Sequence, residues 1–160
     1  MLPANLVEFI HGPVILSLGT RNAALRPAVG RPVGVFADAV ADRISFFLPR
    51  VQAQPHLDNI ADNGFVALAA GDGLTSQNFQ FKGKVIDIRD SMPADAAVRD
   101  LYHDKLLAYM HRWPFQIPDE LVTGYIVDPS VTITFRVAKI FNQTPGPGAG
   151  KPVDFSPGGA

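Results

Sequence analysis

The sequence has no cysteine and almost no net charge, and both absences exclude whole classes of function. Without cysteine there is no disulfide, no thiolate metal site and no cysteine nucleophile. The 14 basic and 15 acidic residues give a formal charge of −1, and the basic residues form no run or stripe. Nucleic acid is therefore not an expected partner.

Long apolar runs are absent as well. No stretch approaches the ~20 apolar residues that span a bilayer. The N-terminus also lacks the basic region and the apolar stretch of a secretory signal. We therefore expect a soluble, cytoplasmic protein. With 160 residues, the chain is long enough to form one domain with a proper core.

The central part of the chain has the clearest pattern. Arg43–Leu48 is predicted to be a strand, and a Pro-Arg turn leads from it into a polar helix over Gln52–Asp62. An Asn-Gly pair stops this helix. The nearly all-apolar stretch Phe65–Ala70 predicts the next strand, and the alternating stretch Gln77–Arg89 predicts a longer one.

The flanking regions supply the remaining elements. They are an opening helix over Pro3–His11, a strand over Val14–Thr20, an interrupted strand over Leu25–Phe36, a late helix over Pro93–Met110 and a last strand over Val131–Val137 that continues towards Phe141. The interrupted strand contains two prolines and must bulge or lie at an edge, because proline cannot donate to a ladder. It is predicted to pair with the strand at Arg43 as a hairpin.

The late helix has a predicted cap and a predicted semi-apolar stripe. Ser91 is the expected cap. Residues at spacings of three and four predict one semi-apolar face, made of Val98, Leu101, Tyr102, Lys105 and Tyr109. In total, about six strands with helices between them predict an α+β, mainly β, small barrel over residues 1–143. Residues 144–160 are rich in proline and glycine and are predicted to be a C-terminal arm or a disordered tail.

Several local features follow one another in a particular order. They are Thr20-Arg21 at the end of the first strand, Pro27 and Arg31 in the second, Phe46-Phe47 before the turn, the helix-to-strand passage from Leu57 to Leu68, and Gln77-Asn78 with Gly83 in the long strand. In this order the chain resembles the pyridoxamine 5'-phosphate oxidase-like family over roughly Leu6 to Ile140. The resemblance implies a six-stranded antiparallel split barrel with flanking helices. It also implies a homodimer that binds FMN in a groove between its two barrels.

The same resemblance implies a set of cofactor-binding positions. They are Thr20, Arg21, Arg31, Leu48, Arg50, Gln54, His56, Gln77 and Asn78. By resemblance, Arg31 and Arg50 hold the phosphate, whereas Thr20 and Asn78 bond the ring or the ribityl chain. Trp113 either shields the ring or packs against the core or a dimer interface. The catalytic residues and the substrate stay open, because the redox chemistry of such an enzyme belongs to its cofactor.

The chain departs from the family pattern at the start of the short helix. Family members carry serine followed by arginine or lysine there, whereas this chain has Gln54-Pro55-His56. Proline lacks an amide proton, and histidine is largely neutral at pH 7. Arg50 is the expected source of the missing charge, with help from Thr20 or Arg21.

This departure keeps a second hypothesis open. The chain would be a split-barrel module without FMN that binds deazaflavin or haem, or that acts as a dimeric interaction protein. In the haem alternative His103 or His111 would ligate the iron; otherwise both are surface histidines. No histidine has the His-Glu-x-x-His spacing, so no protein-bound metal is expected. Oxidation of pyridoxamine phosphate itself is disfavoured, because the segment after Phe141 offers only Lys151 for a second phosphate.

Overall fold

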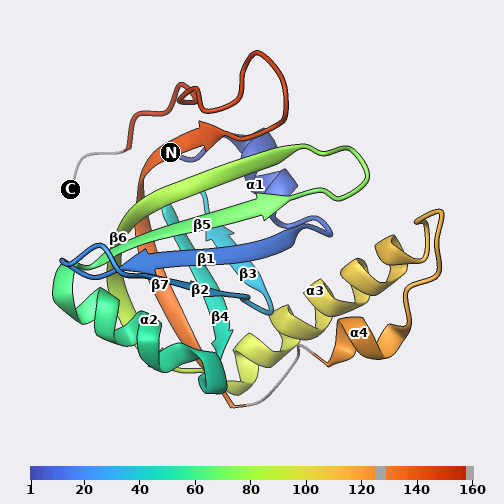
Figure 1. The fold of residues 1–160 in the computed structure, drawn as a ribbon, viewed down its shortest axis with the longest axis horizontal. Helices are drawn as coiled ribbons and strands as arrows, with labels where there is room; N and C mark the ends of the chain where they lie inside the picture. The colour runs from blue at the N-terminus through green and yellow to red at the C-terminus, as the bar shows by residue number, and fades with distance from the viewer. Residues whose placement is uncertain (125–128, 158–160) are drawn as a thin grey trace.

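The computed structural model describes residues 1–124 and 129–157, which form one antiparallel sheet with helices around it (Figure 1). The elements are α1 (Ala4–Ile10), β1 (Ile15–Arg21), β2 (Pro27–Gly30), β3 (Val35–Asp38), β4 (Arg43–Pro49), α2 (Arg50–Asn63), β5 (Phe65–Gly71), β6 (Asn78–Asp90), α3 (Pro93–Met110), α4 (Asp119–Thr123) and β7 (Ser130–Asn142). The strand order is β2-β1-β5-β6-β7-β4-β3. This mainly-β architecture confirms the predicted fold class.

The sheet has seven strands because the interrupted stretch forms two strands. Its first part, β2, pairs with β1 at one edge of the sheet, and its second part, β3, pairs with β4 at the other edge. Only residues 31–34 lie between them, so the chain itself draws the two edges towards each other and curls the sheet into an open barrel. Pro27 lies in the edge strand β2, and Pro32 lies in the connection between β2 and β3. Neither proline therefore removes an amide donor from a central strand of the sheet. The β3–β4 pair is the hairpin that the sequence predicts.

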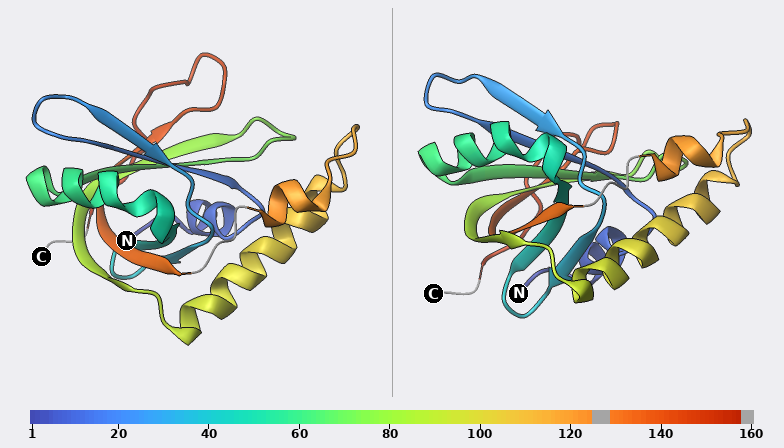
Figure 2. Two further views of the ribbon diagram at one scale, coloured as in Figure 1. Left: turned by 60° about the horizontal axis from the view of Figure 1, so that its bottom comes forward. Right: turned by 90° about the horizontal axis from the view of Figure 1, so that it is seen from below.

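Large aromatic and aliphatic side chains fill the barrel. The largest fully buried ones include Phe46, Phe81, Phe135, Leu16, Leu68 and Ile133. Each lies on an inward position of its strand, as the two-residue side-chain period requires. Two further views show α2 beside the β1–β2 hairpin, whereas α3 runs away from the sheet towards α4 (Figure 2). Among the described residues, no helix is both long and apolar enough to cross a membrane.

Helix α3 begins and ends where the sequence predicts, but its cap and its buried face differ from the prediction. Asp95, not Ser91, closes the first turn, since its carboxylate accepts the Met92 amide proton at 2.7 Å. The buried face consists of Asp95, Arg99, Tyr102, Leu106 and Tyr109. Leu101 and Lys105 of the predicted stripe are exposed. Tyr102 and Tyr109 of the predicted stripe are buried and Val98 is half-buried, whereas the buried face also includes two polar residues outside that stripe, Asp95 and Arg99.

The C-terminal segment folds back along the end of β7. The Asn142 amide donates to the Lys151 carbonyl at 2.9 Å, and the Val153 amide donates to the Ile140 carbonyl at 2.9 Å. Val153 and Phe155 pack against the core. Residues 158–160, the end of the predicted arm or tail, lie outside the described residues.

Candidate functional site

The structure distributes the predicted cofactor residues over three separate places. The first is a buried polar network of Thr20, His56 and Asn59, which we call the buried network. The Asn59 amide donates to the Thr20 hydroxyl at 3.0 Å, and the Thr20 hydroxyl lies 3.0 Å from Nδ1 of His56. His56 is 1% exposed and Thr20 is 6% exposed. Both side chains are thus engaged inside the chain.

The hydrogen bonds of the buried network fix the protonation of His56. The Val29 backbone accepts a hydrogen bond from the imidazole, and Nε2 is the nitrogen available for it because Nδ1 faces Thr20. In the neutral ring the proton therefore lies on Nε2, and Nδ1 accepts the proton of the Thr20 hydroxyl, whose oxygen accepts from Asn59. Burial lowers the pKa of His56, an effect larger than the opposing effect of that backbone bond. A neutral, enclosed imidazole brings no charge to a phosphate.

The second place is the start of α2. Arg50 is exposed and forms an ion pair with Asp90 of β6, which neutralises its charge. Gln54 donates to Asp58 at 2.8 Å on the same helix. The Arg31 amide is tied to Gln52 at 3.0 Å. The cation expected to hold phosphate here therefore already has a carboxylate partner.

The third place is the hairpin between β5 and β6, far along the sheet from α2. Gln77 is exposed, and the Asn78 amide donates to the Thr144 hydroxyl at 3.0 Å. Two further predicted residues join none of these places. Leu48 is fully buried in the core, and Arg21 extends into solvent with its guanidinium 3.2 Å from the Asn22 carbonyl. All nine predicted positions lie in the described residues, and the structure does not bring them together at one place.

A groove that the sequence did not predict lies on the outer face of β3, β4, β7 and β6. We call it the outer groove; its volume is about 610 Å³. Since Ile44, Phe46 and Phe135 point into the barrel, the alternate side chains of β4 and β7 must point outwards. The lining residues are Phe36, Asp38, Arg43, Ser45, Ile86, Asp87, Arg89, Thr134 and Arg136.

Two cations face each other in the outer groove, and a third, Lys84, continues their row outside its lining, with its ammonium over the Phe65 ring. The strand register places Arg43 opposite Arg136, and Arg136 opposite Lys84. We call these three residues the cation row. Like charges directly opposite each other destabilise a sheet. Across residues 1–124 and 129–157, neither Arg43 nor Arg136 has an ion pair or a hydrogen-bond acceptor, and Nε of Arg136 is buried without a partner.

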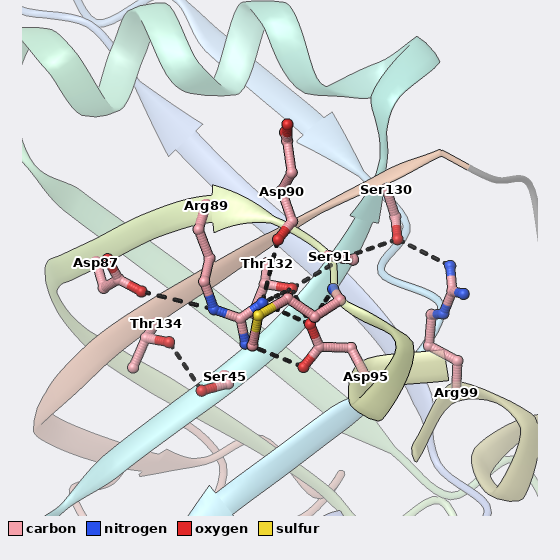
Figure 3. A network of polar contacts seen from close by, with 11 residues as sticks. Ser45, Asp87, Arg89, Asp90, Ser91, Asp95, Arg99, Ser130, Thr132 and Thr134 are labelled. Carbon is pink, nitrogen blue, oxygen red and sulfur yellow. Dashed lines mark hydrogen bonds and ion pairs between the residues drawn. The ribbon is translucent and has the colours of Figure 1, made fainter. Parts of the chain in front are cut away.

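A fourth cation of the outer groove is already neutralised. Arg89 lies between Asp87 and Asp95, and its guanidinium donates to both carboxylate oxygens of Asp95 at 2.5 and 3.0 Å (Figure 3). This bidentate contact lowers the pKa of Asp95 to about 2. Beside it, the Ser45 and Thr134 hydroxyls bond each other at 2.8 Å. Arg43 and Arg136 are therefore the cations lining the outer groove that form no ion pair in the described residues.

The alternative haem ligands are less well placed. His103 lies 3.7 Å from Asp104, and His111 lies 2.8 Å from Asp119. Among the residues that the structure describes, no three metal-ligating side chains converge. Trp113 packs on the hairpin loop, where a methyl group at Gly73 would meet its ring at 2.3 Å.

Comparison with known proteins places the fold but gives no sequence relative. No protein-family model matches the chain, and no curated protein matches its sequence. An F420 reductase matches with a TM-score of 0.56 and 19% identity, over 87% of this chain and 98% of its own. HupZ from Group A Streptococcus matches with a TM-score of 0.55 and 18% identity, over 94% of this chain and 100% of its own.

A third solved structure agrees with these two. It is a candidate pyridoxamine 5'-phosphate oxidase from Lactobacillus delbrueckii, with a TM-score of 0.55 and 16% identity, over 88% of this chain and 93% of its own. Identities this low establish the architecture alone. The chain thus has the split-barrel fold of pyridoxamine 5'-phosphate oxidase-like proteins.

Proposed function

We propose that this chain is a cofactor-binding split-barrel protein that holds FMN or a related deazaflavin in the outer groove and serves as an oxidoreductase on a small molecule. The observation that carries the proposal is the cation row, in which Arg43 and Arg136 oppose each other and neither forms an ion pair in the described chain, although Asp38 lies opposite Arg43 on the neighbouring strand. Phosphate is the anion that paired guanidinium groups bind best.

The residues of the outer groove fit such a ligand in charge and in shape. The buried, unpartnered Nε of Arg136 is a donor that needs an acceptor, and a phosphate oxygen supplies one. Phe36 and Ile86, about half exposed, offer apolar surface for an aromatic ring. The groove volume of about 610 Å³ lies within the range of small-molecule sites.

In this proposal the side chains bind and orient, and the cofactor brings the redox chemistry. A bound flavin would supply hydride or electron transfer, which no side chain of the outer groove provides. Arg43 and Arg136 would hold the phosphate, and the Ser45 and Thr134 hydroxyls would be available to the polar edge of the ligand. An F420 reductase and a candidate pyridoxamine 5'-phosphate oxidase are among the structural neighbours, which makes deazaflavin and FMN the first candidates.

We propose further that the protein is a homodimer whose second copy covers the outer groove. Phe36 and Ile86 are 49 and 46% exposed along this face. Apolar side chains that gather beside a charged groove are typical of an interface. A partner barrel would remove them from water and lower the dielectric around the cation row, which strengthens its hold on an anion.

The test combines a spectrum with a titration. The freshly purified protein should absorb near about 375 and 450 nm if it retains a flavin. Protein freed of ligand should bind added FMN or F420, and Arg136→Gln should weaken this binding by about tenfold or more. Arg26→Gln is the matched control, because Arg26 is exposed outside the groove. A colourless protein that binds neither compound overturns the proposal.

The start of α2 favours a second candidate, a split barrel that binds an anionic ligand other than FMN. The position expected to grip the FMN phosphate holds the buried His56 and the Asp90-paired Arg50. A sharp Soret band, with no binding of FMN or F420, would support this candidate and identify haem, with His103 and His111 as the iron ligands to substitute first.

A further inference from the structure

A second groove lies beside the outer groove, between α1, β3 and α3. We call it the α3 groove; its volume is about 290 Å³. Its walls are mostly apolar, and two polar groups stand at one end. The lining residues are Ile10, His11, Val35, Phe36, Val98, Leu101, Tyr102 and Lys105. None of these is among the positions that the family resemblance marks.

His11 presents a single hydrogen-bond donor at this end. Its Nε2 accepts the Ala37 amide proton at 2.9 Å, so the imidazole proton lies on Nδ1. Burial, and then the nearby Lys105 ammonium, lower the pKa of His11. The ring also stacks on Phe36, with 5.6 Å between the ring centroids. His11 is therefore a fixed, neutral donor on a rigid aromatic wall.

Lys105 supplies an uncompensated charge at the same end. Its ammonium group donates to the His11 carbonyl at 3.0 Å, which ties α3 to α1. Among residues 1–124 and 129–157 no carboxylate pairs with it. An ammonium group has three donors, and a carbonyl uses one. Two donors remain for an acidic ligand.

Two apolar side chains that line the α3 groove are about half exposed. Leu101 is 55% exposed and Phe36 is 49% exposed, although both border the groove. Tyr102 adds the face of its ring rather than its hydroxyl, because the hydroxyl donates to the Val14 carbonyl at 2.8 Å. A flat apolar body fits between these side chains, and its contact with them removes surface from water.

We propose that the α3 groove binds a small aromatic carboxylate, with the ring between Phe36 and Leu101 and the carboxylate on Lys105 and Nδ1 of His11. This proposal does not depend on flavin binding in the outer groove. Phe36 lines both grooves, so a ligand in the α3 groove lies across one side chain from any ligand in the outer groove. That position suits the second reactant of a cofactor-dependent reaction.

The probe is 2-naphthoate, compared with its neutral analogue 2-naphthylmethanol, and binding is measured by equilibrium dialysis. Lys105→Gln should weaken the naphthoate complex by about tenfold, because a charge-assisted bond becomes a neutral one. The alcohol should bind equally well to both proteins. Leu101→Ser should weaken both ligands, since it removes the apolar wall that they share.

Two controls separate this site from its alternatives. Lys151→Gln removes an exposed lysine elsewhere and should change nothing. Arg136→Gln should leave naphthoate binding intact, which distinguishes the α3 groove from the outer groove. The proposal is overturned if the wild-type protein binds no naphthoate. That result is expected if a second copy of the protein occupies the α3 groove. Equal losses in Lys105→Gln and Lys151→Gln also overturn it, and so does a loss confined to Arg136→Gln.

Discussion

The buried network and the cation row are two polar clusters built on opposite principles. In the buried network each donor meets an acceptor of the same chain, from Asn59 through Thr20 to His56 and on to the β2 backbone. In the cation row like charges face each other, and Arg136 keeps a buried donor without an acceptor. A polar cluster whose hydrogen bonds are all made within the chain stabilises the fold. A polar cluster that keeps donors and charges without partners is suited to bind a ligand.

The largest expected effect comes from breaking the buried network. His56→Ala removes a fully enclosed ring and leaves the Thr20 hydroxyl and the Val29 carbonyl without their partner. A cavity and two unsatisfied groups together should lower the free energy of unfolding by about 3 kcal/mol. Urea unfolding followed by circular dichroism measures this loss.

The matched control for that variant lies on the same helix. Gln54→Ala removes an exposed side chain whose hydrogen bond is to Asp58, and the free energy of unfolding should change by less than about 0.5 kcal/mol. A His56→Ala protein as stable as Gln54→Ala would mean that the buried network contributes little to the fold. His56 would then be free to serve as the ligand contact that the family resemblance implies.

A pH titration probes the same network with a smaller effect. Because burial lowers the pKa of folded His56 below its unfolded value of about 6.5, the unfolded chain binds more protons between the two values. Stability should therefore be fully present above about pH 6.5 and fall as the pH drops towards the folded pKa. His11, whose pKa burial also lowers, adds to this loss in the same direction.

The measurement is the free energy of unfolding at a series of pH values between about 7.5 and 5. His56→Gln lacks the titrating group, so its stability should depend less steeply on pH than that of the wild type. Identical slopes in the two proteins would contradict the assignment of a neutral, buried His56. Other titrating groups act equally in both proteins and cancel from the difference.

The contrast between the two clusters also explains what the sequence could predict. The run from β4 through α2 to β6 was predicted to within about two residues, because its signals are local. Gly64 illustrates this, since its φ of 75° ends α2 in a conformation that favours glycine. The proline-interrupted stretch showed that a strand must break. It could not show that the two halves join opposite edges, which depends on pairing with distant strands.

The candidate site was harder to predict for the same reason. The sequence marked Thr20 and His56 separately, by resemblance to a family, but their hydrogen bond depends on how α2 packs on β1. Arg43 and Arg136 each occupy an outward position of an alternating strand, a pattern that usually means solvent. Only the pairing of β4 with β7 places the two guanidinium groups opposite each other. No local pattern carries that information.

The smallest expected effect distinguishes the two clusters by its sign: substitution in the buried network should lower the free energy of unfolding, and substitution in the cation row should raise it. Arg43→Thr removes one charge from the cation row and so relieves like-charge repulsion with Arg136. Asp38 lies opposite Arg43 on the other side, but its carboxylate bonds the Val40 and Ala41 amides and forms no ion pair with Arg43 in the described residues, so the repulsion outweighs its attraction. In a weakly binding chloride buffer it should raise the free energy of unfolding by about 0.5 kcal/mol, whereas Arg26→Thr, outside the row, should leave it unchanged. Added inorganic phosphate should stabilise the wild type more than Arg43→Thr, since an anion bound only by the folded state shifts unfolding by mass action. If Arg43→Thr instead destabilises the protein in chloride and phosphate alike, the cation row stabilises the fold as the buried network does and is not an anion-binding site.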